Sequence, residues 1–186
     1  SKDTGTKITF LPSKQIFSSI KFSPNILIKR MRDLAFLNKG IKIIFIDASQ
    51  KKEKVNEFKY EGGVLEFVEF LDEKRDKLQN KNGNDLFKKP IYIEGNKQNI
   101  EIECSLKWNG SYSEDVYPYT NNIHQKDGGT HLLGFRSALT RVINKYANEH
   151  NLLKKNKLTI SGDDIKEGLT CVLSTKIPDP KFSSQT

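Results

Sequence analysis

Two adjacent glycines directly before a predicted helix are the residues best placed to contact a phosphate. Asp127-Gly128-Gly129-Thr130 leads into a segment with helical apolar spacing, so free backbone N–H groups and the helix dipole would point at an anion bound there. The same residues are typical of a tight turn, in which glycine permits positive φ and Thr130 caps the helix. The turn is the favoured interpretation, and phosphate binding is the alternative.

The sequence contains no motif that by itself indicates an enzyme. There is no Walker loop, no GxGxxG after a strand, no nucleophile elbow and no metal-binding helix. His131, near the start of the predicted helix, is interpreted as a surface or capping residue. Cys104 and Cys171 lie in separate apolar stretches and are typical of reduced core residues in a cytosolic protein. We therefore expect no catalytic residue and no metal site.

The composition favours a basic globular chain. Its 186 residues include 31 Lys and Arg against 23 Asp and Glu, for a formal net charge of +8, which is compatible with nucleic acid or phosphate partners. The apolar runs are too short to cross a bilayer, and the N-terminus does not resemble a signal peptide. We expect a cytoplasmic location without membrane contact, and a chain cut from a longer protein.

The elements that would position these residues form two groups, separated by Glu61-Gly62-Gly63. The first group is predicted to contain a strand over 7–11, a helix and two strands over 41–47 and 55–60. Ser23-Pro24 begins the helix, since serine caps and proline suits the first helical position, and Gly40 ends it. The near-continuous apolar character of 41–47 predicts burial on both faces.

The second group is predicted to contain an antiparallel sheet and two longer helices. An amphipathic helix runs from Val64 to Leu78, and strands follow over 91–94 and 100–108. Alternation in 100–108 predicts one buried and one solvated face. Asn109-Gly110 is a strong hairpin signal, which predicts that 111–119 returns beside 100–108.

The remaining elements complete a mixed α/β (α+β) chain. A loop over 120–129 precedes a helix that begins near Thr130. Ser161 caps a short turn, and a last alternating strand covers 169–175. The predicted apolar face of the long helix consists of Leu133, Phe135, Ala138, Leu139, Val142, Ile143 and Tyr146.

Short motifs spread along nearly the whole chain are more specific together than each is alone. In the second part they are Asn121-Asn122-Ile123, Asp127-Gly128-Gly129-Thr130-His131 with Gly134-Phe135-Arg136, Gly162-Asp163-Asp164 with Glu167-Gly168-Leu169-Thr170, and 178–186. In the first part they are Thr4-Gly5-Thr6, Pro12-Ser13 and 29–38. In order and spacing they resemble the B subunits of type IIA DNA topoisomerases. The tail over 178–186 is more similar to gyrase than to topoisomerase IV.

The resemblance implies a division of the chain into two domains. Residues 1–60 would be the C-terminal part of a GHKL-type ATPase domain, a sandwich shared with the Hsp90 chaperone and histidine kinases. Residues 61–186 would be a transducer domain, truncated at its phosphate-sensing loop. The family's transducer has a mixed or antiparallel sheet with a left-handed β-α-β crossover, against the general right-handed preference.

The resemblance also implies roles for three residues. Thr6 matches a threonine that helps to hold the adenine through a water, and Gln185 matches a glutamine that reaches the γ-phosphate. Arg136 matches an arginine on the transducer helix that faces the cavity through which DNA passes. The family's catalytic glutamate, magnesium-binding asparagine, glycine lid and loop lysine match no residue here. The isolated fragment is therefore expected to be inactive and to bind no cofactor.

The function implied is part of the B subunit of an ATP-dependent DNA gyrase, which couples ATP binding and hydrolysis to clamp closure, strand passage and negative supercoiling. The full-length protein would use ATP and Mg²⁺, with DNA, a gyrase A subunit (in an A2B2 assembly) and a second copy of itself as partners. One alternative is a fragment of topoisomerase IV. Another is a non-catalytic basic nucleic-acid-binding module, in which clustered aromatics stack on bases: Trp108, Tyr112, Tyr117 and Tyr119.

Overall fold

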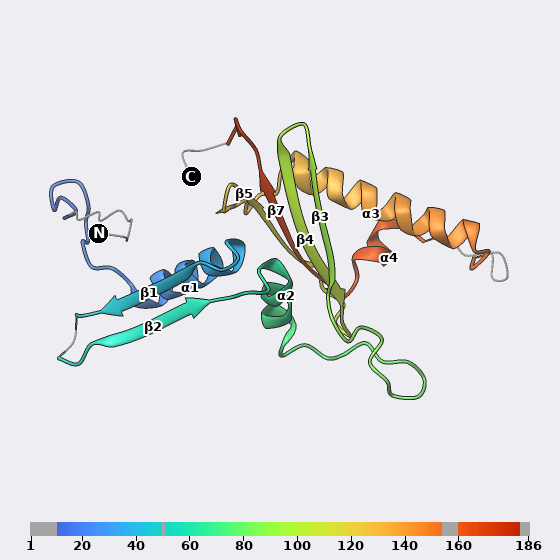
Figure 1. Ribbon diagram of the computed structural model, residues 1–186, viewed down its shortest axis with the longest axis horizontal. Coiled ribbons are helices and arrows are strands. Elements are labelled where there is room, and N and C mark those ends of the chain that lie inside the picture. Colours follow the sequence, from blue (N-terminus) through green and yellow to red (C-terminus); the bar gives the residue numbers. More distant parts are fainter. Residues whose placement is uncertain (1–10, 50, 154–159, 183–186) are drawn as a thin grey trace.

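A computed structural model describes residues 11–49, 51–153 and 160–182. Within this part, two β-sheets and four helices follow one another along the chain (Figure 1). The strand predicted over 7–11 lies outside the described residues except for Leu11, which belongs to no element. Thr6 and Gln185 also lie outside them.

The first sheet is a two-stranded antiparallel ribbon packed on one helix. Strands β1 (Lys42–Asp47) and β2 (Lys54–Lys59) pair with each other and contact α1 (Pro24–Leu37). Helix α1 begins at the predicted position, although the side chain of Ser23 makes no capping hydrogen bond. The predicted burial of both faces of β1 is wrong: Ile44 is 52% and Ile46 is 54% exposed. Among the described residues, only one face of this ribbon is covered by a helix.

The second sheet has five strands in the order β3-β4-β7-β5-β6. Every neighbouring pair is antiparallel except β5 and β7, which are parallel. The class is therefore mixed α+β, as predicted. The five strands in chain order are β3 (Ile91–Lys97), β4 (Ile100–Trp108), β5 (Asp115–Thr120), β6 (Ile123–His124) and β7 (Leu169–Lys176).

Helices cover both faces of this sheet, and β7 lies at its centre. Helix α2 (Val64–Asp72) packs in one core cluster with Val172, and α3 (Thr130–Glu149) contributes Phe135 and Leu139 to the cluster around Cys171. These successive residues of β7 point to opposite faces. Seven of the eight residues of β7 are buried. The short helix α4 (Gly162–Lys166) leads into β7, and Ser161 caps it through a reciprocal pair of bonds with Asp164, as predicted.

The connection from β5 to β7 is the expected left-handed crossover. In Figure 1, with both strands pointing upward, the chain leaves the top of β5, passes behind the sheet as α3, and returns as β7 on the right of β5. A right-handed connection with its helix behind the sheet would place the second strand on the left.

The hairpin predicted at Asn109-Gly110 is wrong. Strand β7 pairs with β4 along its length, from Trp108↔Leu169 to Glu101↔Lys176, so it separates β4 from β5. The side chain of Asn109 is buried and bonded to Asp72 and Thr170 instead of lying in a solvent-exposed turn. The two-residue turns occur at Gln98-Asn99 and Asn121-Asn122, where all four residues have positive φ, typical of type I′ hairpins. The second of these turns and β6 lie inside the predicted loop over 120–129.

Three burial or length predictions are also wrong in part. Helix α2 ends at Asp72 rather than Leu78, and the Asp72 carboxylate there is bound by Lys107 of β4 and Thr170 of β7. Burial does not alternate along strand β4. Its first apolar residues, Ile100 and Ile102, are exposed, whereas Ser105, on the face predicted to be solvated, is buried. Helix α3 exposes part of its predicted apolar face, namely Leu133, Val142 and Tyr146. Its inward side includes Leu132, Phe135, Leu139 and Ala147.

Cys104 and Cys171 are buried free thiols on neighbouring strands, as expected of reduced core residues, with their sulfur atoms 3.7 Å apart. Within the described ranges, no helix combines the length and apolar character needed to cross a membrane.

Candidate functional site

Helix α1 and the five-stranded sheet share a single core cluster, so the two parts of the chain are joined by packing. Phe36 and Leu37 of α1 lie in one cluster with Tyr119 of β5 and Val172 of β7. The ring of Phe36 stacks on Phe67 of α2 at a centroid distance of 4.6 Å. Rings stacked in a buried cluster contribute both burial and specific geometry. A displacement of α1 therefore acts directly on the sheet.

The turn at Asn121-Asn122, here called the asparagine turn, lies beside the end of β7. The side chain of Asn121 accepts a hydrogen bond from the Ile177 N–H (2.8 Å) and donates one to the Ile177 carbonyl (2.9 Å). The Asn121 N–H donates to the carbonyl of Thr175 (2.8 Å). The amide side chain thus replaces a neighbouring strand for the first residue after β7.

The same turn is bonded to α1. The Arg30 guanidinium donates to the Asn122 carbonyl (2.7 Å), and the Asn122 side-chain amide donates to Oδ1 of Asn38 (3.1 Å). Both contacts are partly buried and join residues more than 80 positions apart in sequence (differences of 92 and 84). The asparagine turn therefore contacts α1 on one side and the tail after β7 on the other.

The surroundings of the asparagine turn are partly desolvated and basic. Burial lowers the pKa of His124 in β6, and the nearby charges of Lys126, Lys29 and Arg30 lower it further. Burial raises the pKa of Asp33 on α1, while the neighbouring cations Lys29, Arg30 and Arg32 act against this. A carboxylate or phosphate brought to this side of α1 would meet a local excess of positive charge.

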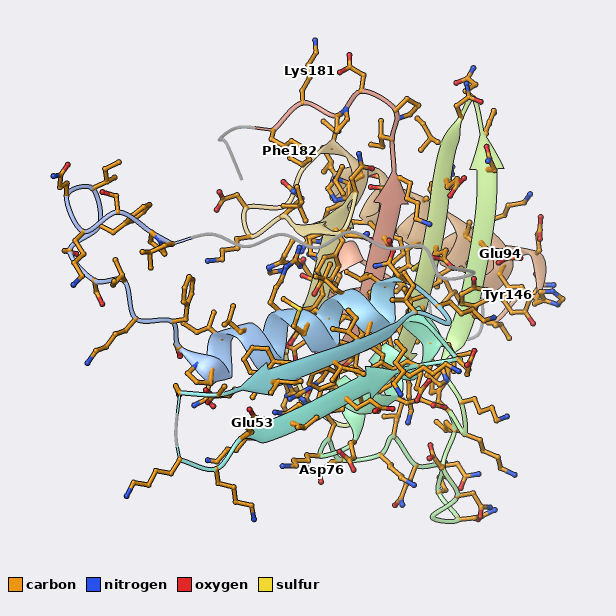
Figure 2. All side chains as sticks on the ribbon, turned by 60° about the vertical axis from the view of Figure 1, so that its left-hand side comes forward. Glu53, Asp76, Glu94, Tyr146, Lys181 and Phe182 are labelled. Carbon is orange, nitrogen blue, oxygen red and sulfur yellow. The ribbon has the colours of Figure 1, made fainter. Side chains whose placement is uncertain are left out.

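The tail that follows Ile177 leaves the sheet directly beyond the Asn121–Ile177 contact. Pro178, Asp179 and Pro180 follow Ile177, and Figure 2 shows Lys181 and Phe182 beyond the tip of β7. Within the described part of the chain, residues 178–182 make no hydrogen bond. The Asn121–Ile177 pair is thus the last bonded contact before the tail.

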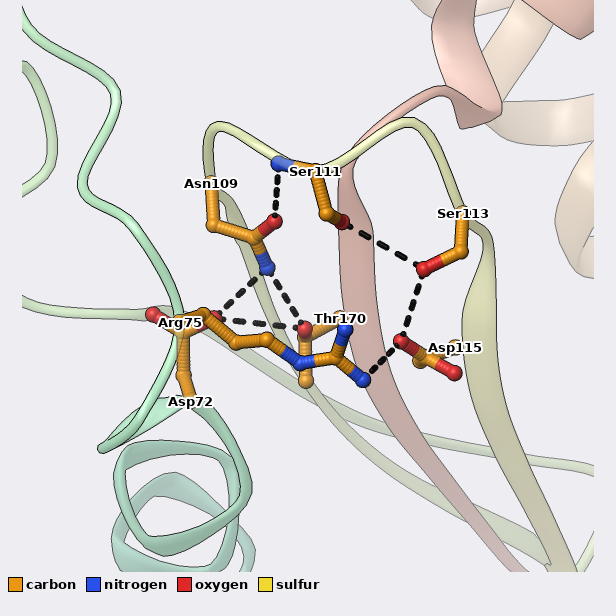
Figure 3. A network of polar contacts seen from close by, with 7 residues as sticks. All are labelled: Asp72, Arg75, Asn109, Ser111, Ser113, Asp115 and Thr170. Atoms are coloured by element: carbon orange, nitrogen blue, oxygen red, sulfur yellow. Dashed lines mark hydrogen bonds and ion pairs between the residues drawn. The ribbon is translucent and has the colours of Figure 1, made fainter.

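The opposite end of β7 is fixed by a buried network built on Asp72, and Figure 3 shows the part of it that joins Asp72, Asn109 and Thr170. The Asp72 carboxylate pairs with the Lys107 ammonium (3.1 Å) and accepts from the side-chain amide of Asn109 (2.7 Å). Thr170, the second residue of β7, contacts both Asn109 (3.0 Å) and Asp72 (3.3 Å). The side chains of Asp72 and Lys107 are only 4% and 12% exposed.

Arg136, expected to face DNA, lies on α3 and is paired within the chain. Its Nε and one terminal nitrogen donate to the two carboxylate oxygens of Glu114, at 2.8 and 2.9 Å. The side chain is 38% exposed. A DNA phosphate would have to compete with this bidentate carboxylate.

The glycine pair before α3 forms a tight turn. Gly128 and Gly129 have φ values of 76° and 153°, and the Gly128 N–H donates to the Gln125 carbonyl (3.0 Å). Gly129, not Thr130, is the N-cap of α3. These contacts support the turn interpretation given to these residues from the sequence.

The aromatic residues considered for base stacking do not form one exposed surface. Tyr119 is 2% exposed and packed in the core, and Trp108 donates its indole N–H to the Ile165 carbonyl (2.8 Å). Tyr112 alone among the four is strongly exposed, at 87%. The prediction that these residues form a surface for stacking on bases is therefore wrong.

Metal ions need donor sets that acidic, histidine and cysteine side chains supply. Among the described residues, no three His, Cys, Asp or Glu side chains form a group suited to a metal ion. The two residues expected to contact ATP lie outside the described ranges.

Comparison with known proteins decides the family. The family model described as DNA gyrase B matches residues 63–186. This chain belongs to the DNA gyrase B family. It is 50% identical to the gyrase B protein of Chlamydia pneumoniae and 46% identical to that of Clostridium acetobutylicum, over 98% and 100% of its length. It covers only 22% and 28% of those two relatives.

Two solved structures agree with the fold. The 43K ATPase domain of Thermus thermophilus gyrase B, solved with an aminocoumarin, superposes with a TM-score of 0.75 at 36% identity. The match covers 92% of this chain and 44% of that one. The topoisomerase IV ATP-binding domain of Francisella tularensis, solved with a small-molecule inhibitor, has a TM-score of 0.70 at 23% identity, a likeness of fold.

The sequence marks Asn121-Asn122-Ile123 only as a motif of the resemblance, and it predicts neither the turn there nor the Asp72 network. Consecutive asparagines before a short apolar stretch are a signal for positive φ, because asparagine tolerates that region better than most residues. No local signal marks Asp72 or Lys107, because their partners lie on other elements.

Proposed function

We propose that this chain is the part of an ATP-dependent gyrase B protein that couples ATP binding and hydrolysis to clamp closure and DNA strand passage. In this proposal residues 1–60 complete a GHKL ATPase domain and residues 61–186 form the transducer. The observation that carries it is the shared core of α1 and the sheet, with β7 running from that core into the tail.

Gln185 is the residue of this chain that would contact the γ-phosphate of ATP held by the rest of the full-length protein, and Thr6 would help to hold the adenine. Loss of that phosphate removes a contact present in only one state, so the equilibrium between domain arrangements shifts. Mg²⁺, gyrase A in an A2B2 assembly, a second copy of gyrase B and a cytoplasmic location belong to the same proposal. The chain alone is expected to be inactive.

Replacement of the tail glutamine tests this role. Gln185→Ala in full-length gyrase B should lower ATP hydrolysis, and ATP-dependent supercoiling with gyrase A, by at least about tenfold, since a transition-state contact is lost. Gln15→Ala, in an exposed segment, is the matched control and should retain both activities. Full activity of Gln185→Ala would contradict the proposed contact. Tight ATP binding by the 186-residue chain in calorimetry would contradict the prediction that this chain alone binds no cofactor.

Arg136 is proposed to face the DNA, and salt dependence tests this separately. Arg136→Ala should reduce the slope of log affinity against log salt by about 0.9 if one phosphate contact is lost. Arg141→Ala, exposed on the same helix, is the control for a general loss of charge. Equal changes in the two variants would contradict a specific role for Arg136.

The corresponding protein of topoisomerase IV is the alternative within the type IIA enzymes. It shares the fold, and negative supercoiling in the assay above distinguishes it from gyrase.

A further inference from the structure

We propose that Asn121 is a positioning residue for the tail, and that the asparagine turn transmits the position of α1 to it. This inference rests on the proposed role of the tail in contacting ATP.

The Asn121 side chain holds the backbone of Ile177 through two hydrogen bonds. An amide side chain offers one donor group and one acceptor, and here both are used on the N–H and carbonyl of one backbone residue. The contact fixes the direction in which the chain leaves β7. Pro178 restricts Ile177 further, because a residue before proline is confined to extended conformations.

The Asn121–Ile177 contact lies at the surface of the molecule. Asn121 is exposed, so burial does not require its side chain to be paired, and water competes for both bonds. The net stability from such exposed bonds is small. These bonds set the direction in which the tail leaves β7, because residues 178–182 have no hydrogen bond of their own within the described part of the chain.

The asparagine turn is also linked to α1 and the residue that follows it. Arg30 and Asn38, both in the segment that would belong to the ATPase domain, bond to Asn122, the neighbour of Asn121. The two asparagines share a rigid two-residue turn with positive φ at both positions. A shift of α1 against the sheet therefore moves the backbone that carries the Asn121 side chain.

A second turn in the same sheet provides an internal comparison. Gln98-Asn99 has the same two-residue form, with φ of 53° and 62°. No hydrogen bond from the Asn99 side chain is present among the described residues. The side-chain bonds of the asparagine turn are therefore not a requirement of this type of turn.

The test uses full-length gyrase B with Asn121→Gly and, as matched control, Asn99→Gly. Glycine keeps the positive φ available, so the substitution removes the side-chain clamp without backbone strain. We expect kcat for ATP hydrolysis to fall about tenfold or more, with KM for ATP within about twofold, because misplacing a contacting group affects the transition state more than binding. Asn99→Gly should leave both parameters unchanged.

Asn121→Asp adds a graded step. Its carboxylate still accepts from the Ile177 N–H but cannot donate to the Ile177 carbonyl, so kcat should lie between wild type and Asn121→Gly. Melting temperatures of all three variants within a few degrees of wild type would show that the fold is retained. Should Asn121→Gly fail to fold, the kcat of Asn121→Asp decides the question by itself.

The outcomes separate this inference from the function on which it rests. If Gln185→Ala lowers hydrolysis and Asn121→Gly behaves like Asn99→Gly, the positioning role is wrong and the tail contact stands. If Gln185→Ala has no effect, both are wrong. A rise in KM with unchanged kcat in Asn121→Gly also overturns the positioning role.

Discussion

The two ends of β7 are held by different kinds of contact. At its start, Thr170 joins a buried network built on the Asp72–Lys107 ion pair, with side chains 4% and 12% exposed. At its end, Ile177 is held by an exposed neutral amide. Breaking a buried ion pair leaves an unpaired charge, whereas water can replace an exposed hydrogen bond. The same strand is therefore anchored firmly at one end and reversibly at the end that leads to the tail.

The largest expected effect is at the anchored end. Asp72→Ala removes the carboxylate and leaves the Lys107 ammonium unpaired, and Asn109 and Thr170 lose an acceptor. We expect the free energy of unfolding to fall by about 3–5 kcal/mol, measured by urea denaturation. Glu101→Ala breaks the exposed Lys176–Glu101 pair (48% and 54% exposed) and should cost under about 1 kcal/mol. Equal losses in the two variants would remove the distinction between buried and exposed contacts.

The second effect concerns the close approach of backbone beside this network. Gly168 has φ of 73°, and a Cβ there would lie 2.5 Å from the Asn109 carbonyl oxygen and 2.8 Å from that of Ser111. Gly168→Ala should lower the free energy of unfolding by about 2–4 kcal/mol, from conformational strain and overpacking together. Gly83→Ala is the control: its φ is 75°, with no atom within 4 Å of the added Cβ. The prediction fails if the two alanine variants unfold at the same urea concentration.

At the reversible end, the expected effect on stability is smaller. Arg30→Ala removes the bond to the Asn122 carbonyl and should cost about 1.5–3 kcal/mol, as for a hydrogen bond that involves a charged group. It should also lower ATP hydrolysis by full-length gyrase B, because α1 and the asparagine turn lose their link. Lys29→Ala, exposed on the same helix, should change neither quantity. Normal hydrolysis in Arg30→Ala would show that the turn does not depend on this link.

The smallest expected effect is a pH dependence of the free energy of unfolding. The pKa of His124 is lowered in the folded chain by burial and by Lys126, Lys29 and Arg30, so the unfolded chain binds the proton more readily. The stability from neutral His124 is therefore present above about pH 6.5 and is lost as the pH falls through the folded pKa. Unfolding free energies at about pH 7.5 and about pH 5.5, on either side of this range, should differ less in His124→Gln than in wild type. An identical pH dependence in the two proteins would exclude His124 as the source.

The sequence predicts most of the elements because their signals are local. Ser23-Pro24, Ser161 with Asp164, and the alternation over 169–175 each mark a boundary or an element within a few residues. The resemblance supplies the left-handed crossover, which local patterns and general rules do not.

The pairing of strands fails at Asn109-Gly110 because a hairpin signal describes only the turn. Whether β4 pairs with the next strand or with β7 is decided by contacts between residues far apart in sequence, and those of Asp72 with Lys107 and Thr170 are examples. The burial of α3 fails for a related reason: apolar residues occur on two sides of the helix, and only the sheet decides which side is covered. The roles of Thr6 and Gln185 stay predictions.

The most direct test of unequal anchoring is hydrogen–deuterium exchange of β7 in full-length gyrase B, with and without a non-hydrolysable ATP analogue. We predict that the analogue slows exchange of the amides from Thr175 to Ile177 and of the asparagine turn, while the amides from Thr170 to Val172 are protected equally in both states. A change of the same size at both ends, or a change confined to Thr170–Val172, would contradict it.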